Sequence, residues 1–315
     1  MTTARARQVG MGAAIVALSA CTGLSAARPE QRAEASFDRT LTVSGRVDLD
    51  IQSGSGGINV RAGQADRVEL HARVTASDWN PIRSGPSAEE RVRRVAANPP
   101  VEQKGNRILI GRIDDPDLRN VSISYTLVVP PRTALSAKTG SGSLEIAGLG
   151  ETMALETGSG SIQVRAAGGD VRATTGSGSI DADGVNGAIT ASTGSGGIDV
   201  TQTGRGNVDV STGSGSVRVS GVRGGVLAST SSGTLRIGGE QTGEWRLSTS
   251  SGSIEIALAG KPAFDLDAQS NSGRIETAFP VTVSGTISRR ELRGPVNGGG
   301  PLLHLRTTSG SIRIR

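Results

Sequence analysis

Aromatic side chains are scarce in this chain, which holds two Trp, one Tyr and three Phe among 315 residues. A conventional globular core of this length relies on more large apolar side chains. Proteins that bind single-stranded nucleic acid without sequence preference stack the bases on aromatic rings. The composition therefore predicts an interior filled by small aliphatic side chains, and it gives no support for a nucleic-acid partner.

Cysteine and histidine, which form many metal and nucleophilic sites, are also rare. The only cysteine is Cys21, so no disulfide can form within one chain. His71 and His304 each stand between apolar residues, without a Cys, a second His or a carboxylate at ligand spacing. The serines fall in turn-like segments, and none stands in a G-x-S-x-G elbow. We therefore predict no catalytic residue, no metal site and no cofactor.

The apolar stretch near the N-terminus is too short to cross a bilayer. Arg5 and Arg7 precede an uncharged run over residues 9–20, which has the length of a signal-peptide core. The run ends in LSAC at residues 18–21, which resembles a bacterial lipobox. That resemblance implies that residues 1–20 are a lipoprotein signal peptide and that Cys21 is lipidated, with more than one acyl chain for stable anchoring. An ordinary secretory signal with an incidental cysteine is the alternative.

A lipidated Cys21 places the protein in the cell envelope, with the membrane as a partner through the N-terminal lipid. Thr22 follows the cysteine. In a Gram-negative host this residue favours the outer membrane or its periplasmic face, and in another host the anchored chain would lie at the cell surface.

Glycine, by contrast, is abundant at 46 residues, and much of it recurs in one motif. TGSGSIQV at residues 157–164 resembles a phosphate-binding loop when it is read alone. Such a loop occurs once, between one strand and one helix, whereas this motif returns about ten times with no helical pattern behind it. A glycine of the motif falls at 142, 160, 178, 196, 215, 233, 252 and 273, in steps of 18 to 21 residues. This period predicts the stacked rungs of a solenoid, in which the motif is a turn.

Each repeat also holds two short segments of alternating apolar and polar residues. In the repeat that begins at residue 157, the apolar phase takes in Ile162, Val164, Val171 and Ala173. Alternation places such residues on one face of a strand, and rungs stacked about 4.8 Å apart align them into aliphatic ladders. The predicted fold class is all-β: a single-stranded β-solenoid (β-helix) with rungs of about 18 residues and one short helix inserted in the N-terminal part.

A set of threonines shares the inward phase at the glycine corner: Thr139, Thr157, Thr175, Thr193, Thr212, Thr230 and Thr249. Threonine can place its methyl group inside while its hydroxyl bonds a turn amide. Because an unpaired buried hydroxyl costs about 1–3 kcal/mol, we predict an inward threonine ladder whose hydroxyls are all bonded.

The remaining sequence divides into segments ahead of these repeats. Residues 21–40 are polar and Ala-rich, which predicts a tether from the membrane. Residues 41–136 form a predicted N-terminal β region with a helical insertion near 87–97, where SAEE resembles a capping box. The arginines of that helix, at 91, 93 and 94, are interpreted as a solvated face rather than a basic patch. The solenoid repeats are expected over 137–315.

One stretch of sequence carries a family resemblance. VSISYTLVVPPRTALSAKTGSGSLEI at residues 121–146, together with the closing RTTSGSIRIR, resembles the bacterial putative-adhesin family of unknown function. In that family an alternating strand ends at Pro and leads into T-x-S-G-x-[IVL] rungs. The resemblance covers about residues 41–315 and implies an envelope-anchored β-solenoid without an established chemistry.

Outward charges and one long departure from the repeat are the remaining features. Asp181, Asp183 and Asp199 lie in outward positions, and Arg218 and Arg236 continue the column that Asp181 and Asp199 begin, which predicts a charge ladder rather than a cation site. Residues 278–306 leave the 18-residue period. They are interpreted as a flexible cover over the last rung, and they are also the preferred binding region if one exists.

The predicted function is that of a non-enzymatic envelope lipoprotein, an adhesin-like solenoid acting as a binding or adhesion module toward an envelope protein or glycan. A structural scaffold that self-associates is the alternative, because the chain stops inside a strand at residues 312–315 and a terminal rung exposes unpaired backbone groups. A carbohydrate-active β-helix enzyme is a third interpretation, which the compact corners disfavour. An ice-binding face on the outward hydroxyl column of Thr174 and the serines after it is not favoured.

Overall fold

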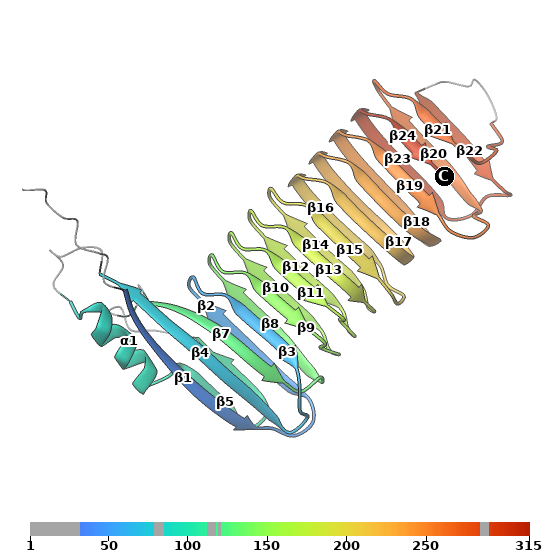
Figure 1. The fold of residues 1–315 in the computed structure, drawn as a ribbon. Coiled ribbons are helices and arrows are strands. Elements are labelled where there is room, and N and C mark those ends of the chain that lie inside the picture. The colour runs from blue at the N-terminus through green and yellow to red at the C-terminus, as the bar shows by residue number, and fades with distance from the viewer. Residues whose placement is uncertain (1–31, 79–84, 112–117, 119–120, 284–289) are drawn as a thin grey trace, which may run out of the picture.

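In the computed structural model, residues 32–78, 85–111, 118, 121–283 and 290–315 are described. They form one elongated sheet that winds round an axis, with a helix at its N-terminal end (Figure 1). The predicted all-β solenoid with a short helical insertion is confirmed. The described elements are β1 (Arg32–Thr42), β2 (Val47–Ser53), β3 (Ile58–Ala62), β4 (Arg67–Ser77), α1 (Ala88–Ala97), β5 (Val101–Lys104), β6 (Arg107–Ile110), β7 (Val121–Val129), β8 (Thr133–Thr139), β9 (Leu144–Ala147), β10 (Met153–Thr157), β11 (Ile162–Arg165), β12 (Val171–Thr175), β13 (Ile180–Val185), β14 (Ile189–Thr193), β15 (Ile198–Gln202), β16 (Val208–Ser214), β17 (Val217–Ser232), β18 (Leu235–Ser251), β19 (Ile254–Leu258), β20 (Phe264–Ser270), β21 (Ile275–Thr277), β22 (Glu291–Val296), β23 (Leu302–Ser309) and β24 (Ile312–Ile314).

Each rung contributes one strand to each of two facing walls. The threonine wall contains the strands that run into the glycine corner: β2, β8, β10, β12, β14, β16, the later parts of β17 and β18, β23 and β20. The opposite wall contains the strands that leave the corner: β3, β9, β11, β13, β15, the earlier parts of β17 and β18, β19, β24 and β21. Parallel pairing with the same rung-to-rung register stacks equivalent residues.

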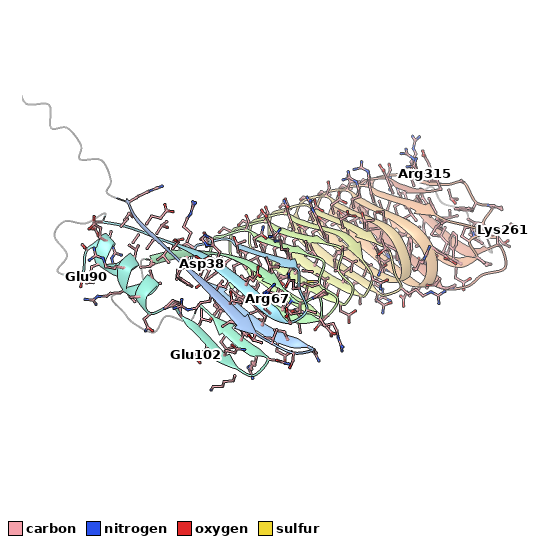
Figure 2. The ribbon with its side chains drawn as sticks, turned by 60° about the horizontal axis from the view of Figure 1, so that its bottom comes forward. Asp38, Arg67, Glu90, Glu102, Lys261 and Arg315 are labelled. Carbon is pink, nitrogen blue, oxygen red and sulfur yellow. The ribbon has the colours of Figure 1, made fainter. Side chains whose placement is uncertain are left out.

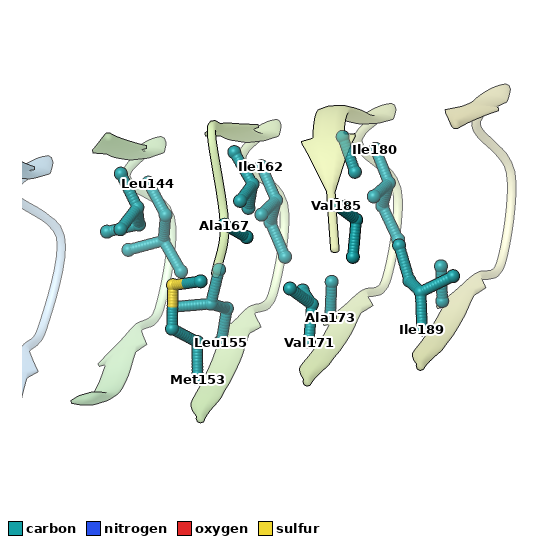
Figure 3. Close-up of a cluster of buried hydrophobic side chains, with 14 of the residues drawn as sticks. Leu144, Met153, Leu155, Ile162, Ala167, Val171, Ala173, Ile180, Val185 and Ile189 are labelled. Carbon is teal, nitrogen blue, oxygen red and sulfur yellow. The ribbon is translucent and has the colours of Figure 1, made fainter. Parts of the chain in front are cut away.

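The aliphatic ladders follow from that register. Ile162 lies opposite Ile180, which in turn lies opposite Ile198, and each is at most 2% exposed. Figure 3 shows these ladders closing the space between the walls. A third, shorter side of the rung adds Leu149, Ala167 and Val185, all buried. Each apolar side chain is therefore buried by the rungs on both sides of its own, as expected for a solenoid.

The inward threonine ladder is confirmed. All seven predicted threonines are buried. The hydroxyl of Thr175 accepts the Gly178 amide at 3.1 Å and donates to the Gly160 carbonyl of the preceding rung at 2.8 Å. Thr157 and Thr193 repeat both bonds. Each of these hydroxyls thus joins its own corner to the corner of the preceding rung.

The order of rungs in space departs from the order in sequence at the C-terminal end. β23 lies between β18 and β20, and β24 lies between β19 and β21. The final rung is therefore inserted between two rungs that precede it in sequence. The threonine ladder follows the same order, since Thr307 donates to Gly252 and Ser270 donates to Gly310.

The N-terminal end has a matching arrangement. β2 lies between β6 and β8, and β3 lies between β7 and β9. The first rung of the chain is thus not at the end of the stack, because it lies between strands that follow it in sequence. The predicted domain boundary after residue 136 falls inside β8, and the pairing of β2 with β8 continues the sheet across it.

Two C-terminal expectations are wrong. Residues 278–306 are not a loose cover, because Glu291–Val296 pairs antiparallel with β20 and β23 begins at Leu302. Residues 284–289 lie outside the described part. The predicted open edge at residues 312–315 is likewise absent, because β24 has a strand on each side.

The predicted tether is wrong for residues 32–40. Arg32–Thr42 forms β1, which pairs antiparallel with β4 along its whole length. Its alternation is weak in sequence because the inward positions of its first half are Ala33, Ala35 and Phe37. Two of those three are small alanines that signal little hydrophobicity, although Ala33 and Phe37 are buried. Residues 1–31, which include the predicted signal peptide and Cys21, lie outside the described residues.

The predicted helix is confirmed as α1, with Ser87 as its N-cap accepting the Glu90 amide at 3.2 Å. It packs on β1 and β4 at the N-terminal end. The interpretation of Arg91 as part of a solvated face is wrong. Its side chain is 9% exposed and donates to Asp78 at 2.8 Å. The Ala88 amide, together with Arg91, outweighs burial and holds the pKa of Asp78 below its ordinary value.

Within the described residues, no helix has the length and hydropathy needed to cross a membrane.

Candidate interaction surface

The outer face of the threonine wall carries a depression near the N-terminal end of the solenoid. Its volume is about 430 Å³, and it crosses β6, β2, β8 and β10. Asp48, Asp50 and Arg107 line it together with Ser136 and Thr152. The depression therefore presents carboxylates, a guanidinium group and hydroxyls side by side, a donor and acceptor set suited to a polar partner.

Ion pairs surround that depression. Arg46 lies 3.7 Å from both Asp48 and Glu151. Lys138 binds Glu156 at 2.8 Å on the adjacent strands, and this hydrogen bond and charge raise the pKa of Lys138. These charges are largely solvent-exposed, so the ion pairs contribute little to stability.

Further along the same wall, small hydroxyl side chains continue the column that Lys138 and Glu156 begin, while the next outward column still carries Arg172, Asp209 and Arg246. Thr174 and the serines at 192, 211, 229 and 248 lie in register on successive strands, as predicted. The Ser211 hydroxyl donates to Ser192 at 3.1 Å. Leu227, 48% exposed, lies beside this column. This part of the wall is polar, with Leu227 as an exposed large apolar side chain.

The outer face of the opposite wall carries the predicted charge ladder. Asp181 and Asp199 are neighbours on β13 and β15, and Arg218 and Arg236 follow on β17 and β18. Arg218 binds Asp199 at 2.6 Å, and Arg236 binds Glu255 at 3.0 Å. A depression of about 290 Å³ lies over these side chains. Asp183 lies on β13 beside Thr201.

A third charged group lies at the C-terminal end, on β20, β22 and β23. Asp267 accepts two hydrogen bonds from Arg306, at 2.9 and 3.1 Å, and one from Arg293 at 2.9 Å. His304 Nδ1 lies 3.2 Å from the same carboxylate. Burial would raise the pKa of Asp267, but the two arginines outweigh it and hold the pKa below its ordinary value. Sequence spacing could not reveal this group, because the inserted rung brings its members together from 267 to 306.

The histidines stand in outward positions, as predicted, but each has a carboxylate neighbour that sequence spacing did not show. His71 Nδ1 lies 2.8 Å from Asp38 of the adjacent strand. Among the described residues, no group of three or more His, Cys, Asp or Glu side chains could hold a metal ion. The candidate lipidation site, Cys21, is not among the described residues, and the candidate region at 278–306 contributes Arg293, His304 and Arg306 to the Asp267 group.

A family model and two solved structures match the chain. The family model described as Toastrack DUF4097 matches residues 40–315. No curated protein matches the chain. Among solved structures, a putative adhesin from Bacteroides fragilis is 14% identical, with 89% of this chain and 97% of that chain covered and a TM-score of 0.38. A putative cell adhesion protein from Clostridium sporogenes is 11% identical, with 89% and 99% covered and a TM-score of 0.20. The resemblance to a bacterial putative-adhesin family of unknown function is thereby confirmed.

Proposed function

The chain belongs to the Toastrack DUF4097 family, and we propose that it is a lipid-anchored envelope protein that acts by surface contact as a binding or adhesion module. The observation that carries the proposal is the division between a filled interior and a polar exterior. Inward positions of the rungs are occupied by buried aliphatic and threonine side chains. A partner therefore meets the outer faces of the walls.

The depression on the threonine wall is the proposed contact site. Asp50 and Ser136 are paired in register there, and Arg107 lies on the next strand beyond β2. Parallel strands hold these groups at fixed spacing, so little conformational entropy is lost when a partner binds. A glycan or a polar protein segment of the envelope fits this mixture of acceptors and donors.

A contact role also accounts for the charges of the other faces better than a catalytic role does. Asp199, Glu255 and Asp267 are each bound to an arginine. A general acid or base in glycoside cleavage must exchange its proton with the substrate. At Asp267 the two arginines hold the pKa of the carboxylate below its ordinary value, which suits a stable charged surface.

The proposed anchor lies close to the folded part of the chain. Eleven residue steps separate Cys21 from Arg32, where β1 begins. A fully extended segment of that length reaches about 35–40 Å. A lipid on Cys21 would thus hold the N-terminal end of the solenoid near the membrane while the rungs project along the sheet.

Membrane fractionation of a Cys21→Ala variant tests the anchor. The natural chain is expected in the membrane fraction and the variant in the soluble fraction, with Ser25→Ala as a matched control that stays in the membrane. A variant that remains in the membrane fraction would contradict the lipid anchor.

Photo-crosslinking of the anchored chain tests the contact face. A crosslinker at Ser136, in the threonine-wall depression, is expected to give a discrete adduct. One at Asp181, on the opposite wall, serves as the comparison. An adduct from Asp181 alone would contradict the proposed face, and the absence of any adduct from both positions would count against action by contact.

A further inference from the structure

The strand edges at the two ends of the solenoid differ in how they are protected. Natural proteins shield sheet edges by keeping them short or by placing proline or lysine in them. β5 has four residues, follows Pro99 and Pro100, and ends in Lys104. β21 has three residues, and β22 carries Pro295 and bridges to Val281. Three of the four edges thus carry recognised protection.

β1 is not short and holds neither proline nor lysine, although its outward face is charged and α1 packs on it. It is 11 residues long, RAEASFDRTLT, without proline, glycine or lysine. In the described part of the chain it pairs with β4 and with no other strand. Figure 1 shows it as the outermost strand at the N-terminal end of the sheet. A strand of this length can pair with another through a full row of backbone hydrogen bonds.

We infer that this edge binds a second copy of the chain, with the two β1 strands antiparallel about Ala35. In this register Arg32 of one copy lies opposite Asp38 of the other, on the outward face. On the inward face Ala33 lies opposite Phe37, so a small side chain meets a large one. Because the pairing is two-fold symmetric, each of these contacts occurs twice.

The charges of β1 select this register over its neighbours. A shift of two residues in one direction places Glu34 opposite Asp38, and a shift in the other direction places Glu34 opposite its own copy. Like charges directly opposite each other destabilise a strand pair, whereas opposite charges stabilise it. A shift of one residue would place the inward Ala33 and Phe37 opposite outward side chains of the second copy, so the inner faces would not continue.

Helix α1 fits the same two-fold arrangement. It lies over both β1 and β4. With strands about 4.8 Å apart, the helices of the two copies would be separated by about 10 Å, near the 8–10 Å of packed helices. The helices would run antiparallel, and Glu89 precedes Arg93 along each of them, both with highly exposed side chains. The first turn of each helix, which holds Glu89 and Glu90, would therefore face the last turn of the other, which holds Arg94.

The paired molecule would be a rod in which the two solenoids continue one sheet in opposite directions. Figure 2 shows β1, with Asp38, at the end of the molecule opposite Arg315. The two outer contact faces would then lie on either side of a central pair of N-termini. Two linked contact faces bind a multivalent surface more tightly than one. The dimer itself stands without this consequence and without the lipid anchor.

The mass of the full chain carrying Cys21→Ser, measured over a dilution series, tests the inference without any lipid. A dimer that dissociates on dilution is expected. Arg32→Glu and Asp38→Arg are each expected to raise the dimer dissociation constant by about tenfold or more, and the double variant to return it close to the starting value. A chain that is monomeric at about 100 µM would overturn the inference, as would a double variant no better than the singles.

Disulfide trapping tests the register separately. In the Cys21→Ser background, Ala35→Cys would lie opposite its own copy at about 4.5–5.5 Å between Cα atoms, within disulfide reach. Thr40→Cys on the same strand is the control, since it lies about 30 Å from its copy in this register. Rapid covalent dimer formation by Ala35→Cys alone is expected. Equal trapping of the two variants, or faster trapping at position 40, would overturn the register.

Discussion

At the residue scale, the Thr175 hydroxyl of the ladder makes two hydrogen bonds, and its sequence position predicts only one of them. The phase of the repeat predicts that Thr175 points inward and that its hydroxyl bonds a turn amide. The second bond, to the Gly160 carbonyl of the neighbouring rung, could not be predicted from one repeat alone. It depends on the register of two rungs, which only stacking defines.

Replacing this hydroxyl with a methyl group isolates that contribution. Thr175→Val keeps the volume but leaves the Gly178 amide and the Gly160 carbonyl without their partner. We expect a loss of about 2–4 kcal/mol in the free energy of unfolding, measured by denaturant titration. Thr174→Val, one residue away and exposed, should cost about 0.5 kcal/mol or less. Similar losses for the two variants would contradict the structural role of the ladder.

The glycine corners are required for a different physical reason, the close approach of stacked backbones. A Cβ atom on Gly160 would lie 1.9 Å from the Gly142 carbonyl oxygen of the preceding rung. Because both groups are backbone, neither can move aside.

Gly160→Ala should therefore lower the melting temperature strongly and reduce the yield of folded protein, as seen by circular dichroism. Gly54→Ala is the matched control, since a Cβ there meets nothing within 4 Å. An unchanged melting temperature for Gly160→Ala would show that the corners do not stack as closely as described.

At the element scale, a helix or strand could be predicted where neighbouring residues in the sequence specify it, and not where a distant partner does. The helix over residues 88–97 is specified by neighbouring residues, because Ser87 caps an amide three positions on. Strand β1 is specified by its distant partner β4, and its alanine-rich inward face gave no local signal. The burial of Arg91 could not be predicted for the same reason, since Asp78, which pairs with it, lies 13 positions away, directly after β4.

The insertion of the final rung leads to a prediction that a solenoid stacked in sequence order would not give. Removing residues 302–315 would leave a slot with open strand edges on both sides, rather than one missing cap. We expect hydrogen exchange to show loss of protection in β20 and β22, and a peptide of residues 302–315 to restore it. A short extension after exposed Arg315 should leave protection unchanged. Full protection of β20 in the truncated chain would contradict the insertion.

The Asp267 group ties three C-terminal strands together and should do so in a pH-dependent way. Its pKa in the folded protein is lowered, so its contribution is present above the unfolded pKa of about 3.9 and is lost as the pH falls through the folded value. Asp267→Asn is expected to cost about 1–2 kcal/mol of stability at neutral pH.

The difference between the Asp267→Asn variant and the natural chain should shrink below about pH 4, where the natural side chain also loses its charge. Thermal unfolding followed over pH measures this difference. Asp265→Asn, at an exposed neighbouring position, is the control. A difference that stays constant down to pH 2 would contradict the ionic role of Asp267.

At the scale of the whole molecule, the recurring glycines at 142, 160 and 178 were enough to predict the solenoid. They were not enough to predict the order of its rungs. The closing RTTSGSIRIR offers the same alternation and the same corner as any other rung, so its place in the stack is not encoded locally. The loop lengths and the end contacts of β20 and β22 decide it, and these involve residues far apart in sequence.

This order also determines where the molecule can make contacts. Because β24 is enclosed, residues 312–314 offer no open edge, and the proposed self-association is instead placed at β1, at the other end. The Asp267 group joins a residue that precedes the departure at 278–306 to residues within it, and its His304 and Arg306 reach Asp267 because the final rung is inserted beside β20. The polar outer walls remain continuous between the two ends.

The most direct test of this account is disulfide trapping of the rung order, in the Cys21→Ser background. Glu255 and Arg313 lie in register on adjacent strands, as do Arg313 and Glu276, whereas Glu255 and Glu276 are separated by β24. Paired cysteines at 255 and 313, or at 276 and 313, should therefore oxidise readily, and cysteines at 255 and 276, about 10 Å apart, should not. Ready oxidation of the 255–276 pair would mean that the rungs stack in sequence order, and it would contradict the account.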